Sequence, residues 1–131
     1  MIDANKPRGQ LLIQTLAMPR DTNANGDIFG GWMVSQMDLA AGIFAKKHCN
    51  GRAATVAINQ LQFILPVRVG DLLSCYVHLT KQGNSSMTLW VETWKETFAT
   101  HERHRVAEGS FVFVAIDESG QPRTIVDHHD H

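Results

Sequence analysis

The sequence predicts an α+β fold in which one long helix packs against a largely antiparallel β-sheet. A single apolar run of helical length covers residues 31–48, and the strand-like segments after it follow one another through short turns. Strands joined by short turns pair antiparallel. At 131 residues, with no linker, repeat or second hydrophobic unit, the chain has the size of one domain that buries its own core.

The elements follow in a simple order. The segment 10–17 favours a first strand, which Pro19 ends, and a loop of turn residues runs from there to Gly30. The helix follows and stops at Asn50-Gly51, a pair typical of helix C-termini. Four further strands are expected over residues 54–63, 72–81, 87–97 and 103–116, with turns at 66–71 and 83–86. We expect a single domain over residues 10–125 between flexible segments at 1–9 and 126–131.

The predicted strands are too apolar for a sheet with one face in water. In the last strand Phe111 and Phe113 point one way while Val112 and Val114 point the other. One helix covers only part of one face, so we infer that a second copy of the chain covers the rest and that the protein is a homo-oligomer. The alternative is a strongly curved monomeric sheet wrapped around the helix, as in cystatin-like folds.

Composition excludes several classes of function. The net charge of −1 and the absence of a basic stripe argue against nucleic acid binding. No apolar run is long enough to span a bilayer, and the N-terminus lacks the apolar stretch of a signal peptide. Cys49 and Cys75 form no metal-binding spacing and are expected to be reduced thiols, so we expect a cytoplasmic protein that binds neither nucleic acid nor membrane.

Asp38 is the most informative residue of the chain because it interrupts the apolar helix. Its neighbours at helical spacing are Val34, Ala41, Gly42 and Ala45, none of which pairs with a carboxylate. It lies beside the most apolar face, so a surface acid or a carboxylate bonded to a distant arginine is also possible. Gly42, one turn later, weakens the helix but clears space for a ligand next to Asp38.

The loop before the helix contains the other predicted parts of a site. Gly30 and Gly31 either let the chain enter the helix tightly or expose backbone N–H groups at its N-terminus, where a developing oxyanion is stabilised. Asn25 and Gly26 fit a turn, and Asp27 fits either a supporting role in the site or a helix cap. A glycine-rich loop, a helix N-terminus and an unpaired acid together indicate a site that processes a carbonyl group.

A metal site or a serine nucleophile is not expected. The histidines are scattered over a tail (His128, His129, His131), a helix end (His48), a hairpin (His101, His104) and a strand (His78). A metal needs three or four convergent ligands, and these spacings do not supply them. No Gly-x-Ser-x-Gly elbow is present, and Ser35, one turn before Asp38, has no histidine near it in sequence.

These residues resemble a known family, the YciA-like acyl-CoA thioesterases of the hotdog-fold superfamily. The resemblance covers residues 10–125 and is carried by the stretches 15–19, 21–32, 35–38, 51–52, 55–57, 69–71 and 113–117, together with Phe63 and Pro66. Its most specific part is the run Asn-Ala-Asn-Gly-Asp-Ile-Phe-Gly-Gly-Trp at 23–32, followed by Ser-Gln-Met-Asp at 35–38. The chain departs from the family pattern at Asn59 and at Ala40-Ala41-Gly42, which leaves the acyl preference open.

The resemblance implies a fold, an assembly and an activity. It implies a long central helix wrapped by a curved antiparallel sheet, with the sheets of two chains joined across a dimer and the dimers assembled as a hexamer, a trimer of dimers. It implies metal-free, cofactor-free hydrolysis of acyl-CoA, with Asp38 as general base or nucleophile and the backbone at Gly30 and Gly31 as the carbonyl-binding element. Asp38 of one chain is then expected to face the loop of its partner.

The coenzyme A part of the substrate requires cations and hydrogen-bond donors for its phosphates. The residues that we predict for this role are Arg52, Lys81, Arg68, Ser85 and Ser86. Two other functions remain open at this stage: a non-catalytic acyl-CoA-binding sensor, and a hotdog hydratase or dehydratase acting on acyl thioesters. The latter chemistry usually needs a histidine beside the acid, and none stands near the loop before the helix.

Overall fold

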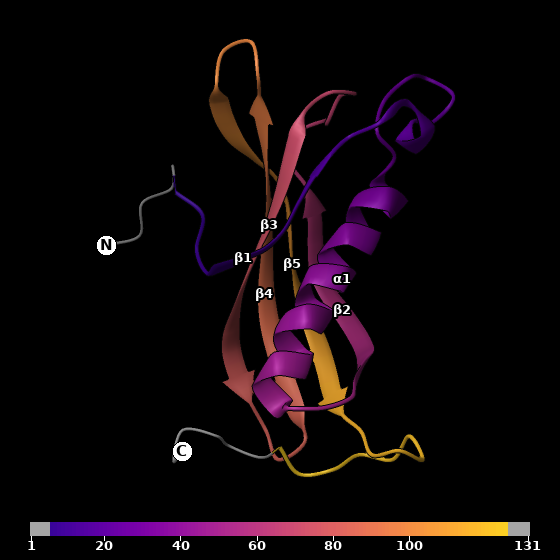
Figure 1. The fold of residues 1–131 in the computed structure, drawn as a ribbon, viewed down its shortest axis with the longest axis vertical. Helices are drawn as coiled ribbons and strands as arrows, with labels where there is room; N and C mark the ends of the chain where they lie inside the picture. Colours follow the sequence, from indigo (N-terminus) through magenta and orange to yellow (C-terminus); the bar gives the residue numbers. More distant parts are fainter. Residues whose placement is uncertain (1–5, 126–131) are drawn as a thin grey trace.

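The computed structural model describes residues 6–125, which form one long helix and five strands (Figure 1). In chain order these are β1 (Gln10–Leu16), the 3-10 turn η1 (Pro19–Asp21), α1 (Gly30–Cys49), β2 (Ala53–Phe63), β3 (Leu72–Gln82), β4 (Ser86–Thr97) and β5 (Glu102–Ala115). The predicted helix and all five predicted strands are confirmed to within one residue at each end. Residues 1–5 and 126–131, which include the histidine-rich tail and most of the segments predicted to be flexible, lie outside the described residues.

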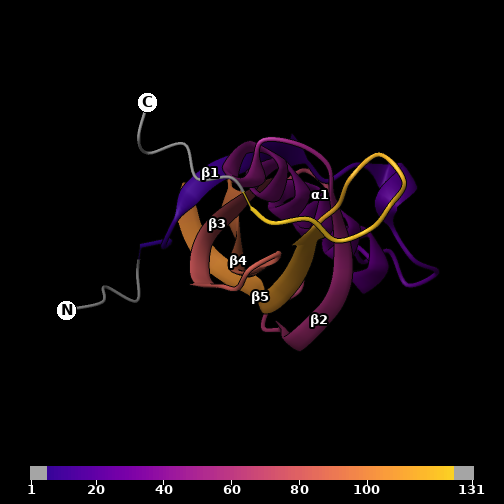
Figure 2. The ribbon, with the colours of Figure 1, turned by 90° about the horizontal axis from the view of Figure 1, so that it is seen from below.

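The five strands form one sheet in the order β1-β3-β4-β5-β2, and every neighbouring pair is antiparallel. Figure 2 shows the sheet curving around α1, which lies in its hollow. The helix contacts every strand of the sheet. The α+β architecture of a central helix wrapped by a curved antiparallel sheet is therefore confirmed.

The helix begins and ends where the local sequence predicts. Asn50 takes the left-handed conformation at φ 55° and donates its backbone N–H to Lys46, which closes the last turn. Met37 and the alanines at positions 40, 41 and 45 are fully buried, so the helix face that they share sits against the sheet. Nothing helical within residues 6–125 combines the length and apolarity that a membrane span requires.

The core lies between α1 and the inner face of the sheet. Leu89 and Val91 of β4 and Phe111 and Phe113 of β5 point into it, as the alternation of these strands predicts. Small alanines on the helix let its backbone approach these large side chains closely. The packing fixes the position of α1 relative to β2 and β5, and this position determines the surroundings of Asp38.

The outer face of the sheet carries a buried carboxylate that sequence reasoning missed. Glu92 is only 1% exposed, and its oxygens accept hydrogen bonds from Arg8 Nε at 2.7 Å and from the indole N–H groups of Trp90 and Trp94 at 3.1 and 3.2 Å. Arg8 also lies over the ring of Trp90. The chain's own N-terminal segment thus covers part of the face that we assigned to a partner.

The pKa of Glu92 reflects these contacts. Burial raises the pKa of its carboxyl group, but the hydrogen bonds from Arg8, Trp94 and Trp90 outweigh this effect and hold the pKa below the ordinary value. A lowered folded-state pKa means that the ionised form stabilises the fold. This stabilisation is present in full above the ordinary pKa of 4.5 and is lost as the pH falls through the lowered value.

We predict that Glu92→Gln lowers the free energy of unfolding by about 1.5–3 kcal/mol at pH 7, the range for a hydrogen bond to a charged group. The amide loses the ion pair with Arg8 and turns an N–H group toward indole donors. Urea unfolding at pH 7 and pH 3.5 measures the effect, which should shrink at the lower pH because the carboxyl group of the unfolded chain then binds a proton, and this lowers the stability of the wild type. Glu118→Gln, in an exposed loop, is the control. Equal stability of wild type and Glu92→Gln at pH 7 would contradict the prediction.

Candidate functional site

Asp38 lies midway along α1, half-buried, on the side of the helix that faces β2. Its Oδ1 accepts a hydrogen bond from the hydroxyl group of Thr55 at 2.7 Å. No ion pair formed within residues 6–125 includes Asp38, so the arginine partner considered as an alternative is not found there. The carboxylate is held through one oxygen by a neutral donor, and Oδ2 has no hydrogen-bond partner in the same range.

A cavity of about 190 Å³, the Asp38 cavity, opens beside this carboxylate. Gly42 creates part of the space, because a Cβ atom built there would lie 3.7 Å from the ring of Phe113, in ordinary contact with it. The orientation of α1 about its own axis therefore places the Asp38 cavity next to the Asp38 carboxylate. The lining residues are Asp38, Leu39, Gly42, Ile43, Lys46, Ala53, Thr55 and Phe113.

The N-terminus of α1 carries no side-chain cap. Phe29 occupies the cap position in an extended conformation, and no side chain bonds to the first turn. The interpretation of Asp27 as a helix cap is therefore wrong, because Asp27 lies two residues before the cap position and belongs to the preceding turn. Within residues 6–125 the amides of Gly30 and Gly31 find no acceptor, so the helix presents two bare N–H groups.

The loop before the helix is folded by Asn23 and not by the residues that we singled out. Asn23 Oδ1 accepts the backbone N–H groups of Asn25 at 2.9 Å and Asp27 at 3.2 Å. Gly26 has φ +83°, a conformation that suits glycine and closes this turn. Asn25, Gly26 and Asp27 are exposed and support the loop backbone, and none of the side-chain bonds found joins them to Asp38, Gly30 or Gly31.

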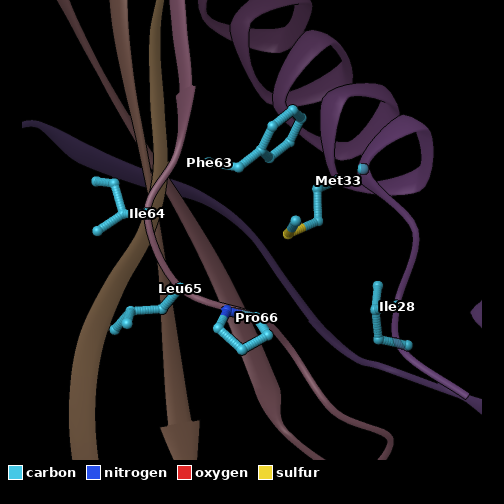
Figure 3. A pocket seen from close by; sticks show the side chains of 7 residues that line it. Ile28, Met33, Phe63, Ile64, Leu65 and Pro66 are labelled. Atoms are coloured by element: carbon cyan, nitrogen blue, oxygen red, sulfur yellow. The ribbon is translucent and has the colours of Figure 1, made fainter. Parts of the chain in front are cut away.

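An apolar groove of about 510 Å³ lies against the start of the helix. Figure 3 shows Phe63 and Met33 pointing into the space between the strand end and α1. The ring of Phe63 lies 3.0 Å from where a Cβ atom at Gly30 would stand, so any larger residue at position 30 displaces it. The residues lining the apolar groove are Ile28, Gly30, Met33, Phe63, Ile64, Leu65 and Pro66.

One chain does not bring the bare amides and the acid together. Gly30 and Asp38 are eight residues apart on a straight helix, which separates them by about 12 Å along its axis. A carbonyl group that accepts a hydrogen bond from an amide and reacts at its carbon needs both partners within about 3 Å. The Asp38 cavity and the apolar groove also share no lining residue.

The residues predicted to bind coenzyme A fall into two places. Lys81, Ser85 and Ser86 lie at the β3–β4 turn, near the end of α1. Arg68 lies before the start of β3, beyond the opposite end of this 11-residue strand, or about 36 Å away at 3.3 Å per residue. Arg52 donates to the backbone carbonyls of Asp117 at 3.2 Å and Glu118 at 3.0 Å, so its guanidinium group also holds a loop.

No metal or thiol site competes with Asp38 within residues 6–125. No group of three or more histidine, cysteine, aspartate or glutamate side chains converges there. His101 and His104 face Glu96 and Glu102 in the exposed hairpin, and His48 is bonded to Gln82. Both cysteines are buried, and burial raises the pKa of the Cys75 thiol to about 11, which keeps it protonated and unreactive.

Thr55 is the residue of the candidate site that sequence reasoning missed. It appeared only as part of a β2 strand pattern and of the family resemblance, with no role assigned. A hydroxyl residue among the alanine, valine and isoleucine side chains of residues 53–58, the first half of β2, was the available signal. Its importance follows from the packing of α1 on β2, which the local sequence does not specify.

Comparison with known proteins identifies relatives across almost the whole chain. The family model of the thioesterase superfamily matches residues 25–99. The acyl-CoA thioester hydrolase YciA of Escherichia coli is 44% identical over 124 residues, which cover 92% of this chain and 94% of that protein.

Solved structures agree with the family model. A hexameric broad-specificity acyl-coenzyme A thioesterase, solved as an aspartate-to-alanine variant, superposes with a TM-score of 0.91 at 46% identity and covers 95% of this chain and 91% of that chain. An acyl-CoA hydrolase from Staphylococcus aureus, solved with butyryl coenzyme A, is 27% identical with a TM-score of 0.81, covering 88% of this chain and 70% of that one. It was also studied as an aspartate-to-alanine and a threonine-to-alanine variant, altered at positions 17 residues apart.

Proposed function

Because the chain belongs to the hotdog thioesterase superfamily and to its YciA-like acyl-CoA thioester hydrolases, we propose that Asp38 drives the hydrolysis of acyl-CoA to a free carboxylate and coenzyme A. The single observation that carries this assignment is the Asp38–Thr55 hydrogen bond at the wall of the Asp38 cavity. The two residues are 17 positions apart, the same separation as the aspartate and threonine altered in the Staphylococcus aureus enzyme.

In the proposed reaction the thioester carbonyl accepts a hydrogen bond from the amides at Gly30 and Gly31. Asp38 of the partner subunit stands on the other side of the carbonyl carbon, since the two elements of one chain are too far apart. The Thr55 hydroxyl group holds Oδ1 and leaves Oδ2 directed to the reaction. The oxyanion donors are worth roughly 10²–10³-fold in rate and a positioned base roughly 10²–10⁴-fold.

Two routes use this geometry. In the first, Oδ2 takes a proton from a water molecule whose oxygen attacks the carbonyl carbon. In the second, Oδ2 itself attacks and forms a mixed anhydride, which water then hydrolyses. In both routes the C–S bond breaks and its electron pair leaves on the sulfur of coenzyme A. In the first route the proton held by Oδ2 passes to this thiolate; in the second, water attacks the acyl carbon of the anhydride, which returns Asp38 as a carboxylate, and one proton of this water goes to the thiolate. The carboxylic acid product releases the remaining proton to solvent and keeps one oxygen from water.

The proposed assembly is a homodimer with a shared site, further assembled as a hexamer like the relatives described as hexameric. We propose that Lys81, Ser85 and Ser86 act as one group on the coenzyme A phosphates, and that Arg52 and Arg68 contribute from separate places. The enzyme needs no cofactor and works in the cytoplasm, whose reducing conditions suit the two buried thiols of Cys49 and Cys75.

We predict that Asp38→Asn lowers kcat by at least about a hundredfold while the fold and coenzyme A binding are retained. Asparagine keeps the size of the side chain but neither accepts a proton at neutral pH nor attacks as an anion. The measurements are kcat with one acyl-CoA substrate, Kd for coenzyme A by calorimetry, and Tm. A variant that keeps more than a tenth of wild-type kcat would rule out the mechanism, and a wild type that binds acyl-CoA without turning it over would support the sensor function.

We predict that Thr55→Val lowers kcat about tenfold or more, with little change in KM. Valine has the same shape but donates no hydrogen bond, so the carboxylate loses the group that orients it. The matched control is Thr80→Val, since the Thr80 hydroxyl group donates to the backbone carbonyl of Thr88 on an exposed part of the sheet and to nothing else within residues 6–125. Rescue by Thr55→Ser and not by Thr55→Val would confirm that the hydroxyl group matters, and equal kcat values for wild type and Thr55→Val would disprove its role.

We predict that hydrolysis does not depend on a metal ion. The reaction is assigned to a carboxylate, a hydroxyl group and backbone amides, none of which needs a cation to act. Activity should survive prolonged dialysis against a chelator and should not rise when divalent metals are added back. Loss of activity in chelator that one metal restores would contradict this.

A further inference from the structure

The start of α1 takes its position from the residues before it. Gly30 and Gly31 carry no side chain that could pack, and no side chain caps the helix. The backbone carbonyl of Phe29 accepts the N–H groups of Trp32 at 3.2 Å and Met33 at 3.4 Å. Because the C=O and N–H groups of one trans peptide point in opposite directions, the N–H of Gly30 then points away from the helix. The direction of the bare amides therefore follows from the position of Phe29.

Two other segments of the chain hold Phe29 and its neighbour Ile28. The N–H of Phe29 donates to the backbone carbonyl of Asp21 at 3.3 Å, and the N–H of Ile28 donates to the backbone carbonyl of Val67 at 3.2 Å. Asp21 ends the 3-10 turn before the loop, and Val67 precedes the turn that leads into β3. The last two residues of the loop are thus held from two sides.

The turn that ends at Asp21 and the turn that ends at Asp71 have the same construction. Asp21 donates its N–H to the carbonyl of Met18 at 2.9 Å, and its Oδ2 accepts the N–H of Met18 at 3.0 Å. The same two bonds join Asp71 to Arg68, at 3.1 and 3.0 Å. In each turn an aspartate closes a ring with the residue three positions before it.

Backbone hydrogen bonds join the two turns to each other. Ala17, which is 1% exposed, donates its N–H to the carbonyl of Asp71 at 3.0 Å and accepts the N–H of the glycine before Asp71 at 2.8 Å. Asp21 and Asp71 are both buried. The two turns therefore act as one unit, which we call the loop clamp (residues 17–21 and 67–71).

A buried carboxylate is a costly way to close a turn, because it loses water on folding. Neither aspartate takes part in an ion pair formed within residues 6–125. Uncharged serine or asparagine side chains close many turns. A carboxylate accepts a backbone N–H in a hydrogen bond about twice as strong, so it holds the turn more rigidly. Rigidity is useful where hydrogen-bond donors must be in place before charge develops on a substrate.

We infer that Asp21 and Asp71 are positioning residues for the proposed hydrolysis: by closing the loop clamp they fix the end of the loop, and with it the direction of the bare amides at the start of α1. The inference rests on the proposed function, because it takes these amides as the groups that bind the carbonyl oxygen. Both aspartates act through the backbone of the loop, and neither touches the reacting atoms.

The Phe29→Pro variant tests the bond between the loop and the loop clamp. Phe29 has φ −78°, which proline adopts, and proline lacks the N–H that donates to Asp21. Phe29→Ala is the matched control, because it also loses the ring but keeps the N–H. We expect kcat of Phe29→Pro to lie at least about tenfold below that of Phe29→Ala with similar KM, since the amides act on charge that develops in the transition state. Equal kcat values would overturn the inference.

Side-chain variants test the two aspartates. Asp21→Ala and Asp71→Ala remove the acceptor and should each lower kcat at least about tenfold with little change in KM, because the oxyanion donors are then misplaced. Asparagine keeps an acceptor oxygen, so Asp21→Asn and Asp71→Asn should have at least about threefold higher kcat than the alanine variants. Equal losses for alanine and asparagine would overturn the inference. If the alanine variants do not fold, the two Phe29 variants decide.

Glu92→Gln is the control for lost stability, since it alters a buried carboxylate on the outer face of the sheet. It should keep the kcat of the wild type although its Tm is lower. A loss of kcat in Glu92→Gln as large as in Asp21→Ala would overturn the inference, because kcat would then follow stability alone.

Hydrogen exchange measured by mass spectrometry tests the loop clamp without any substrate. Asp21→Ala should speed the exchange of amides in residues 22–29, which include the N–H groups of Ile28 and Phe29, and should leave those of β4 unchanged. Unchanged exchange in residues 22–29 would overturn the inference.

The outcomes separate the inference from the proposed function. Wild-type protein that hydrolyses no acyl-CoA would overturn the proposed function, and with it the role of the loop clamp in catalysis, even if the exchange result is as expected. Wild-type protein that hydrolyses acyl-CoA while Phe29→Pro and Phe29→Ala do so equally well would overturn the inference alone.

Discussion

The pitch of a single helix is the constraint on which the rest of this structure depends. Both the bare amides at Gly30 and Gly31 and the carboxylate of Asp38 belong to α1, and eight helical residues keep them about 12 Å apart. No side-chain rearrangement in one chain closes that distance. A site built from these parts therefore needs two chains, as the proposed function requires.

The sheet positions the acid for this role. Large side chains from β4 and β5 pack against alanines of the helix, so α1 lies in a fixed orientation and Asp38 faces β2. The Thr55 hydroxyl group then meets one carboxylate oxygen, and Gly42 leaves the other side open. On the outer face of the sheet Glu92 ties the N-terminal segment to two indole groups, whereas Asp38 on the helix faces the inner side, so the two carboxylates have different surroundings. The inner one stays accessible to a ligand, whereas the outer one is fully bonded.

Sequence reasoning succeeded where the signal is local. The helix was predicted from its apolar run and from the Asn50-Gly51 stop, and the strands from alternations such as the one around Phe111 and Phe113. These signals are reliable because backbone conformational preference and the alternation of buried and exposed positions depend on residues close together in the chain. It failed where partners are distant in sequence. Asp27 was interpreted as a possible cap although the turn organised by Asn23 uses it, and neither Thr55 nor Glu92 received a role because their partners lie 17 and 84 residues away.

The sequence by itself determined the architecture and the family, because residues close together in the chain carry both signals. It also singled out Asp38 and the glycine pair at the start of the helix as the candidate site. Only the tertiary structure decided that Asp38 is held by a hydroxyl group and not by an arginine, that the predicted coenzyme A residues lie at opposite ends of the sheet, and that the acid and the amides of one chain do not meet. These facts depend on how the helix crosses the curved sheet. That crossing is set by the volumes of side chains far apart in the chain, which no local pattern encodes.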